Sequence, residues 1–185
     1  MSEMNKYQIN RIEIKGFKSI KEADIDFNML NVLIGANGAG KSNLISLFVL
    51  LQQLINKKLQ NYISKLDGPD ALLYFGNKET DALYISIYFG KNGYRFRLTP
   101  TQGGQMMFDD EWFFWETIKT RSIGSGHLES LWTEGTKTGI DDYIKPIFQN
   151  QKWRVYHFHD TSDAARLKNY VILMKISSSL LMLET

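Results

Sequence analysis

The sequence predicts an α/β fold in which a buried parallel strand and a helix, joined by a glycine-rich loop, lie beside an antiparallel β-layer. Three observations predict it. A short apolar run, residues 30–34, leads directly into the glycine-rich residues 35–42, and residues 43–59 then have the pattern of a largely apolar helix. Residues 83–98 alternate between apolar and polar around an Asn-Gly turn, as antiparallel hairpins do. The 185 residues suffice for one domain with its own core.

Two short strands are predicted before the glycine-rich loop. Isoleucines separated by polar residues predict a first strand over about residues 7–14, followed by a turn at residues 17–20. Residues 23–27 alternate between apolar and acidic, the pattern of a strand with one face in water. We expect the two strands to pair antiparallel, because their apolar residues can then share one face of the sheet.

The helix over residues 43–59 is apolar around most of its circumference, so we expect it to be buried between layers. The turn sequence Asp-Gly-Pro-Asp at residues 67–70 marks the end of the helical region. The hairpin of residues 83–98 follows as the clearest strand pair in the chain.

Three further elements are predicted beyond the hairpin. Residues 110–120 contain a run of aromatic residues and predict a helix capped by Asp109 or Asp110. Residues 122–139 hold several glycines and predict a long irregular connection, and residues 153–158 predict a strand.

The glycine-rich loop fills every fixed position of the phosphate-binding pattern G-x-x-x-x-G-K-[ST]. Its members are Gly35, Ala36, Asn37, Gly38, Ala39, Gly40, Lys41 and Ser42. Glycines leave the backbone N–H groups free to surround phosphate oxygens, which side chains would crowd. Lys41 can then reach the β- and γ-phosphates, and Ser42 can place its hydroxyl on Mg²⁺. The pattern, in its strand–loop–helix context, predicts a nucleotide site.

Composition excludes several other classes of protein. The net charge of +2 gives no general electrostatic reason to bind nucleic acid, and the absence of cysteine removes disulfides and thiolate metal sites. The first residues are polar and lack the apolar segment of a signal peptide, and the longest apolar run, residues 47–51, is too short to span a membrane. We expect a cytoplasmic protein without a membrane partner.

Four passages of the chain resemble a known family, and together they span about residues 9–166. They are residues 12–20, 33–44, 83–98 and 156–162. These passages are similar to the opening strand and turn, the phosphate loop, the antiparallel layer and a later segment of the RecF-like and structural-maintenance-of-chromosomes-like ATPase heads. Those heads belong to the ABC superclass, and the likeness is strongest to bacterial predicted AAA-type ATPases.

The resemblance implies a function and a site. Such heads bind ATP and Mg²⁺, dimerise head to head around two nucleotides, and couple hydrolysis to work on DNA or on an effector. By resemblance Asn43, which follows the loop, and Lys18, in the turn after the first strand, join the nucleotide-binding residues. DNA contact is implied by the resemblance alone. The work coupled to hydrolysis, in DNA repair, chromosome handling or defence, stays open.

The catalytic parts of such heads are not recognisable in this chain. The family requires a signature loop, a Walker B strand ending in Asp-Glu and a switch histidine. Residues 101–105 and 106–111 faintly resemble the first two, but they abut without the helix that must separate them, so we interpret them as a turn and a helix N-terminus. No catalytic residue is assigned, and ATP hydrolysis by this chain stays an open expectation.

The resemblance ends near Leu167. We therefore expect residues 1–167 to be the N-terminal lobe of an ATPase head, incomplete by itself. Residues 168–185 would then be a tail altered by truncation or by a shifted reading frame. A non-hydrolytic nucleotide-binding or interaction module is the alternative function. A small-molecule kinase is the third, and it fits the antiparallel strands around the loop less well.

Two clusters admit both a functional and a structural interpretation. His157 and His159 would share one side of a strand, with Asp160 nearby, and they predict either a metal pair or ordinary strand-end histidines in hydrogen bonds. The run from Trp112 to Trp115 cannot all face one side of a helix. Two or three of its members are expected in the core, and the alternative is a patch for a partner.

Overall fold

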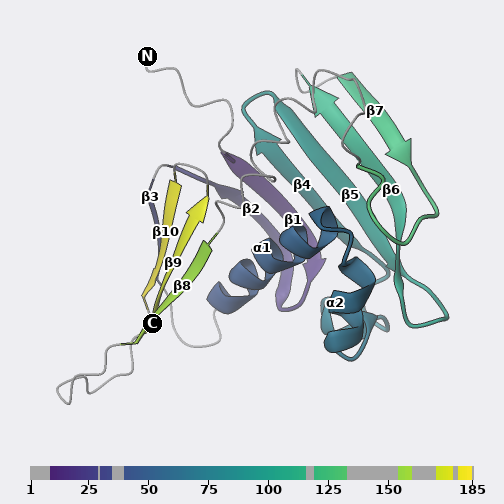
Figure 1. Cartoon of the computed structure of the whole chain (residues 1–185), viewed down its shortest axis with the longest axis horizontal. Helices are drawn as coiled ribbons and strands as arrows, with labels where there is room; N and C mark the ends of the chain where they lie inside the picture. The colour runs from purple at the N-terminus through teal and green to yellow at the C-terminus, as the bar shows by residue number, and fades with distance from the viewer. Residues whose placement is uncertain are drawn as a thin grey trace.

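The structure, a computed structural model, describes residues 9–28, 30–34, 40–115, 119–132, 154–159, 170–176 and 179–184. Its strands and helices form two sheets and a helical layer (Figure 1). The elements are β1 (Arg11–Phe17), β2 (Ile20–Asp26), β3 (Leu30–Ile34), α1 (Lys41–Ile55), α2 (Leu59–Lys65), a short 3-10 helix (Pro69–Ala71), β4 (Leu83–Phe89), β5 (Asn92–Pro100), β6 (Met106–Trp115), β7 (Lys119–Gly124), β8 (Arg154–His159), β9 (Tyr170–Ile176) and β10 (Ser179–Glu184).

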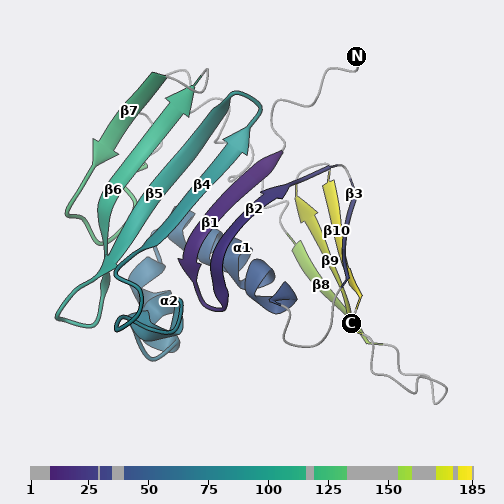
Figure 2. The same cartoon turned by 180° about the vertical axis from the view of Figure 1, so that it is seen from behind.

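The larger sheet is antiparallel and has six strands in the order β2-β1-β4-β5-β6-β7. The predicted pairing of the first two strands is confirmed, with Ile12 opposite Ile25. Ile12 also lies opposite Ile87 of β4, and both side chains are fully buried. Apolar residues therefore line up across strands on one face, the face that α1 and α2 cover (Figure 1), while the opposite face is open (Figure 2).

Helix α1 packs on the sheet through a broad apolar stripe. Its buried residues recur at helical spacing: Leu44, Ile45, Leu47, Phe48, Leu50, Leu51 and Leu54. The predicted buried helix is confirmed, but it ends at Ile55 instead of continuing to residue 59, and α2 begins after a short turn. Lys57 in that turn has a φ of 54°, a left-handed conformation that a continuous helix does not allow.

The hairpin of β4 and β5 is confirmed, with a tighter turn than the Asn-Gly signal indicates. Phe89 pairs with Asn92, so Gly90 and Lys91 form a two-residue turn and Gly93 lies inside the strand. Gly93 faces Phe114 of β6 so closely that a Cβ atom there would lie 2.0 Å from the ring and 2.3 Å from the carbonyl oxygen of Ile87. The position therefore needs glycine for close packing.

We expect Gly93→Ala to lower the free energy of unfolding by about 1–3 kcal/mol, because one added methyl group forces strand and ring apart. Urea unfolding followed by circular dichroism measures the change. Gly103→Ala is the matched control: it lies in the β5–β6 loop, where a new Cβ would approach nothing nearer than 3.8 Å. Equal stability of the two variants would contradict this account.

The predicted helix over residues 110–120 is wrong, because residues 106–115 form strand β6. The carboxylate of Asp109 does not cap a helix, since it accepts a hydrogen bond from Arg97 of the neighbouring strand at 2.7 Å. Leu98 pairs with Phe108 and Arg97 with Asp110, so Asp109 is an extra residue in a β-bulge. Cross-strand pairing along β5 thus decides the conformation, and the interpretation of residues 106–111 as a helix start is wrong. Residues 101–105 form a turn, as expected.

The smaller sheet holds the strand that leads to the phosphate loop. Its order is β3-β10-β9-β8, and β3 pairs parallel with β10 while the other pairs are antiparallel. The strand predicted over residues 153–158 is confirmed as β8 (Arg154–His159). Both views show this sheet beside β2 and the N-terminal end of α1.

Candidate nucleotide site

The predicted phosphate loop joins the end of β3 to the start of α1. β3 ends at Ile34 and α1 begins at Lys41, and residues 35–39 lie outside the described part of the chain. Gly40 is described, with φ 92° and ψ 0°, and its carbonyl accepts the first helical bonds from the N–H groups of Asn43 and Leu44 at 3.0 and 3.1 Å. Only glycine adopts this left-handed conformation readily, which explains why the last fixed glycine of the pattern stands directly before α1.

Lys41 and Ser42 occupy the first two positions of α1. The N–H groups of a first helical turn have no partner within the helix, and the helix dipole favours an anion near them. No acidic residue lies in the first turn of α1, and no side chain among the described residues caps its N-terminus. Ser42 is exposed and Lys41 is half-buried. The start of α1 is therefore built to accept negative charge.

The turn between β1 and β2 lies against the same end of α1. The Asn43 side-chain amide donates a hydrogen bond to the Ser19 hydroxyl at 2.6 Å. A Cβ atom at Gly40 would lie 3.6 Å from that hydroxyl oxygen, which is ordinary contact distance. The structure thus brings the β1–β2 turn, which carries Lys18, to the predicted site residues Gly40 and Asn43.

Lys18 is a cation in an unusual setting. Its φ is 50°, its backbone N–H donates to the carbonyl of Leu72 at 2.8 Å, and its ammonium lies 5.7 Å from the centre of the Phe17 ring. Burial lowers the pKa of Lys18, and none of the described carboxylates forms an ion pair with it. An anion bound beside the turn would restore the balance of charge.

The register of β10 brings an acidic residue beside the end of β3, where the phosphate loop begins. Glu184 pairs with Ile34, the last residue of β3. P-loop enzymes hold Mg²⁺ partly through an acid on a neighbouring strand, so Glu184 is a position to test for that role. It lies in the stretch after Leu167 that the sequence left unassigned.

Comparison with known proteins identifies the family. The profile of the family described as AAA ATPase domain matches residues 8–178, which is most of the chain. The chain belongs to this family. The resemblance to RecF-like AAA-type ATPase heads is thereby confirmed, and with it the general assignment as an ATP-binding ATPase domain.

Two curated relatives match about half of this AAA ATPase domain. The Septu protein PtuA of Bacillus mycoides is 33% identical over 104 residues, covering 48% of this chain and 14% of its own length. The DNA replication and repair protein RecF of Geobacter metallireducens is 34% identical over 95 residues, covering 49% of this chain and 26% of its own length. The chain therefore matches only a minor part of either relative.

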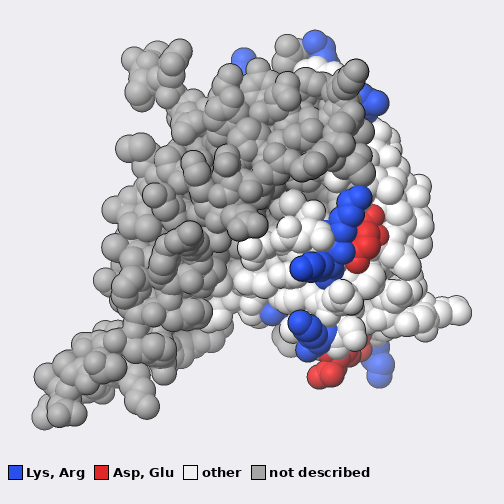
Figure 3. All heavy atoms as spheres, in the orientation of Figure 1, with Lys and Arg blue, Asp and Glu red and all other residues white. Residues whose placement is uncertain are grey.

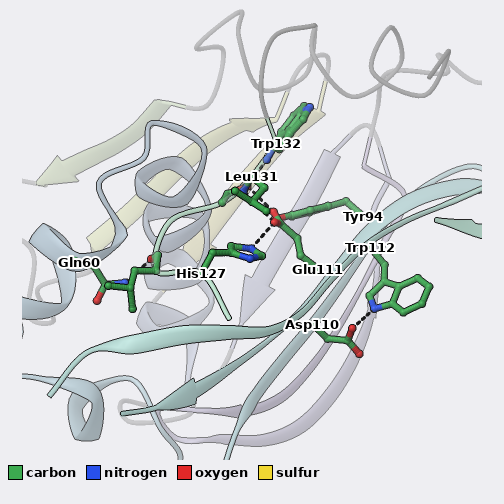
Figure 4. Close-up of polar contacts among 10 residues, drawn as sticks. Gln60, Tyr94, Asp110, Glu111, Trp112, His127, Leu131 and Trp132 are labelled. Carbon is green, nitrogen blue, oxygen red and sulfur yellow. Dashed lines mark hydrogen bonds and ion pairs between the residues drawn. The ribbon is translucent and has the colours of Figure 1, made fainter. Parts of the chain in front are cut away.

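The histidine and aromatic clusters of the sequence have different outcomes in the ATPase domain. Asp160 and the side chains of His157 and His159 lie outside what the structure describes, and the described residues contain no group of three or more metal ligands. The expected core packing of the aromatic run is confirmed for Phe113, which is 2% exposed. Trp112 lies on the open face instead, where it donates to Asp110 (Figure 4).

A buried carboxylate on β6 is the polar feature that sequence reasoning missed. Glu111 is fully buried on the helix-covered side of the sheet, and four partners surround it (Figure 4). The hydroxyls of Tyr94 and Ser130 each donate to it at 2.5 Å, the backbone N–H of Leu131 donates at 3.0 Å, and the His127 Nε2 atom lies 2.8 Å away. We name Tyr94, Glu111, His127 and Ser130 the Glu111 cluster.

The Glu111 cluster anchors a strap, residues 125–132, to the sheet and to α2. The strap pairs with Phe108 through backbone bonds of 2.8 and 2.7 Å. Glu129 accepts the N–H groups of Leu59 and Gln60 at 2.9 and 3.0 Å, which caps the start of α2. Burial first, and then the charge of Glu111, raise the pKa of the Tyr94 phenol well above its usual value, so the phenol keeps the proton it donates. The cluster has the geometry of a structural anchor.

Membrane spanning places a demand on helix length and apolarity that the described helices do not meet. None of them is long and apolar enough to cross a bilayer.

Proposed function

We propose that residues 35–42 bind ATP together with Mg²⁺, with Lys41 on the β- and γ-phosphates and Ser42 on the metal ion. The observation that carries this proposal is the junction at Gly40. This glycine is left-handed and precedes α1 directly, so Lys41 and Ser42 are the first two residues of the helix. The positive end of a helix dipole, a lysine and a hydroxyl at one helix start match what a nucleoside triphosphate with its metal requires.

For the whole protein we propose ATP hydrolysis coupled to work on DNA, with two heads associating around the nucleotides. The relative named for DNA replication and repair supports the DNA-directed role. A defence role is the alternative work for the same ATPase. A module that binds ATP without hydrolysing it is the alternative function for this chain, because no acid beside the loop was recognisable in its sequence.

The charges of the described surface indicate where DNA would not bind. The open face of the larger sheet carries four basic and six acidic side chains. The basic ones are Arg11, Lys15, Arg95 and Arg97, and the acidic ones are Glu13, Glu22, Asp24, Asp26, Asp109 and Asp110. Three of the four cations are already paired with carboxylates at 2.6–2.7 Å. Figure 3 shows acidic and basic side chains mixed on the described part of the opposite face. The described residues of these two surfaces do not form a continuous phosphate-binding patch.

Calorimetric titration of the chain with ATP, in Mg²⁺ and again in excess chelator, tests the proposed binding. We expect binding that weakens without Mg²⁺, because the metal bridges Ser42 and the phosphates. If the chain binds ATP neither with Mg²⁺ nor in excess chelator, the proposed site is contradicted.

Phosphate release, measured with and without duplex DNA, tests the coupled activity. Release that DNA stimulates supports the DNA-directed role, and release that DNA leaves unchanged favours the alternative. If this chain hydrolyses ATP, Glu184→Gln shows whether β10 supplies the acid. ATP binding without any release supports the non-hydrolytic module.

A further inference from the structure

We propose that Ser19 and Asn43 form a positioning pair, which fixes the β1–β2 turn against the phosphate loop and so holds the Lys18 ammonium where it meets the triphosphate of ATP. The inference rests on the proposed nucleotide site. It assigns the antiparallel layer a direct part in ATP binding, through a hydrogen bond between residues 24 positions apart in the chain.

The bond links a rigid element to a turn. Asn43 is the third residue of α1, and its own backbone N–H is bonded to Gly40, so its side chain starts from a fixed position. It donates to the Ser19 hydroxyl at 2.6 Å. Ser19 in turn lies in contact range of Gly40, the last glycine of the loop.

The turn is held from its other side as well. Phe17 is fully buried and forms an isolated bridge with Leu73, and the Lys18 N–H donates to the Leu72 carbonyl at 2.8 Å. Contacts from both sides therefore fix the backbone of the turn. Lys18 adopts φ 50° within it, a left-handed conformation that glycine would adopt with less strain. A lysine at such a position indicates that its side chain is needed there.

The charge of Lys18 distinguishes it from the other lysine near this end of β1. Lys15 is exposed and paired with Glu22 at 2.7 Å, whereas Lys18 is half-buried and has no carboxylate partner among the described residues. A partly desolvated cation without a counter-charge is unfavourable unless an anion binds beside it. The nearest proposed anion is the triphosphate of ATP at the start of α1.

A double-mutant cycle on ATP affinity tests the inference, measured by calorimetry on the full chain in Mg²⁺. We expect Ser19→Ala and Asn43→Ala each to weaken ATP binding about threefold to tenfold, the effect of one lost hydrogen bond. The double variant should be no weaker than either single variant, because both remove the same bond. Ser19→Thr, which keeps the hydroxyl, should bind nearly as the wild type does.

The Lys18→Ala background separates a positioning role from a structural one. If the pair acts through Lys18, adding Ser19→Ala to Lys18→Ala leaves ATP affinity unchanged. If Ser19→Ala keeps its full effect in that background, or has none in the wild type, the inference is overturned. Ser64→Ala, an exposed serine on α2, is the control for substitution alone. Thermal melting confirms that each variant folds, which we expect because Ser19 is exposed.

Failure of the inference and failure of the proposed function give different results. A wild-type chain that binds no ATP overturns both. A wild-type chain that binds ATP through Lys41, but binds it equally well after Ser19→Ala, overturns only the positioning pair.

Discussion

Lys41→Ala should weaken ATP binding by roughly tenfold to a hundredfold, the loss expected when charge-assisted hydrogen bonds to phosphate are removed. The ammonium of Lys41 starts from the first residue of α1, so the helix fixes where it can reach. The effect should exceed that of any neutral residue at the site, because the triphosphate is the most highly charged part of the ligand. Calorimetric titration with ATP and Mg²⁺ measures it.

The matched control is Lys91→Ala. Lys91 is exposed in the turn between β4 and β5, and the strand register places that turn at the opposite end of the sheet from Lys18. It has the same charge as Lys41 and lies at that opposite end of the sheet, so its loss should leave ATP affinity unchanged. Equal affinities for Lys41→Ala and the wild type would show that the loop does not hold the phosphates as proposed.

The sequence identified the elements whose signals are local. The buried helix and the hairpin of β4 and β5 each depend on a few neighbouring residues, and each has the conformation that its pattern predicts. Register and turn type depend on the partner strand, which is why the turn falls on Gly90 and Lys91 although Asn92 and Gly93 carry the usual signal.

Strand β6 shows where local signals mislead. Two aspartates before a run of aromatic residues have the pattern of a capped helix, yet Asp109 and Asp110 bond to side chains of the sheet instead. Aromatic residues fit either conformation, so neighbouring strands decide between them. Once β6 is a strand with a bulge at Asp109, its alternation turns Glu111 inward on the same side as Phe113.

The contacts around Glu111 and Ser19 could not be predicted for a related reason. The partners of Glu111 come from positions 94, 127, 130 and 131. Ser19 of the β1–β2 turn accepts a hydrogen bond from Asn43 of α1. The sequence alone does not show which polar residue will accept hydrogen bonds from several distant donors. Such sites appear only when the packing of the strands is known.

Glu111→Ala should lower the free energy of unfolding by about 3–5 kcal/mol, because each buried donor left without its acceptor costs about 1–3 kcal/mol. The substitution leaves the Tyr94 and Ser130 hydroxyls and the Leu131 N–H without their buried acceptor. It also removes the side-chain bonds between the strap and β6 and leaves only the backbone pairing at Phe108, so the anchorage of α2 through Glu129 and Gln60 is weakened. Urea unfolding measures the change in stability.

Asp110→Ala is the control, because this neighbouring carboxylate is exposed on the open face and, within the described part of the chain, its side chain bonds to Trp112. We expect a change within about 0.5 kcal/mol there. Equal losses for the two variants would show that the Glu111 cluster does not stabilise the fold. Since the strap contacts β6 and α2 and the nucleotide is proposed to lie at the start of α1, the folded fraction of Glu111→Ala should bind ATP with wild-type affinity. A loss of stability without a loss of affinity would establish the cluster as an anchor of the strap, separate from the nucleotide site.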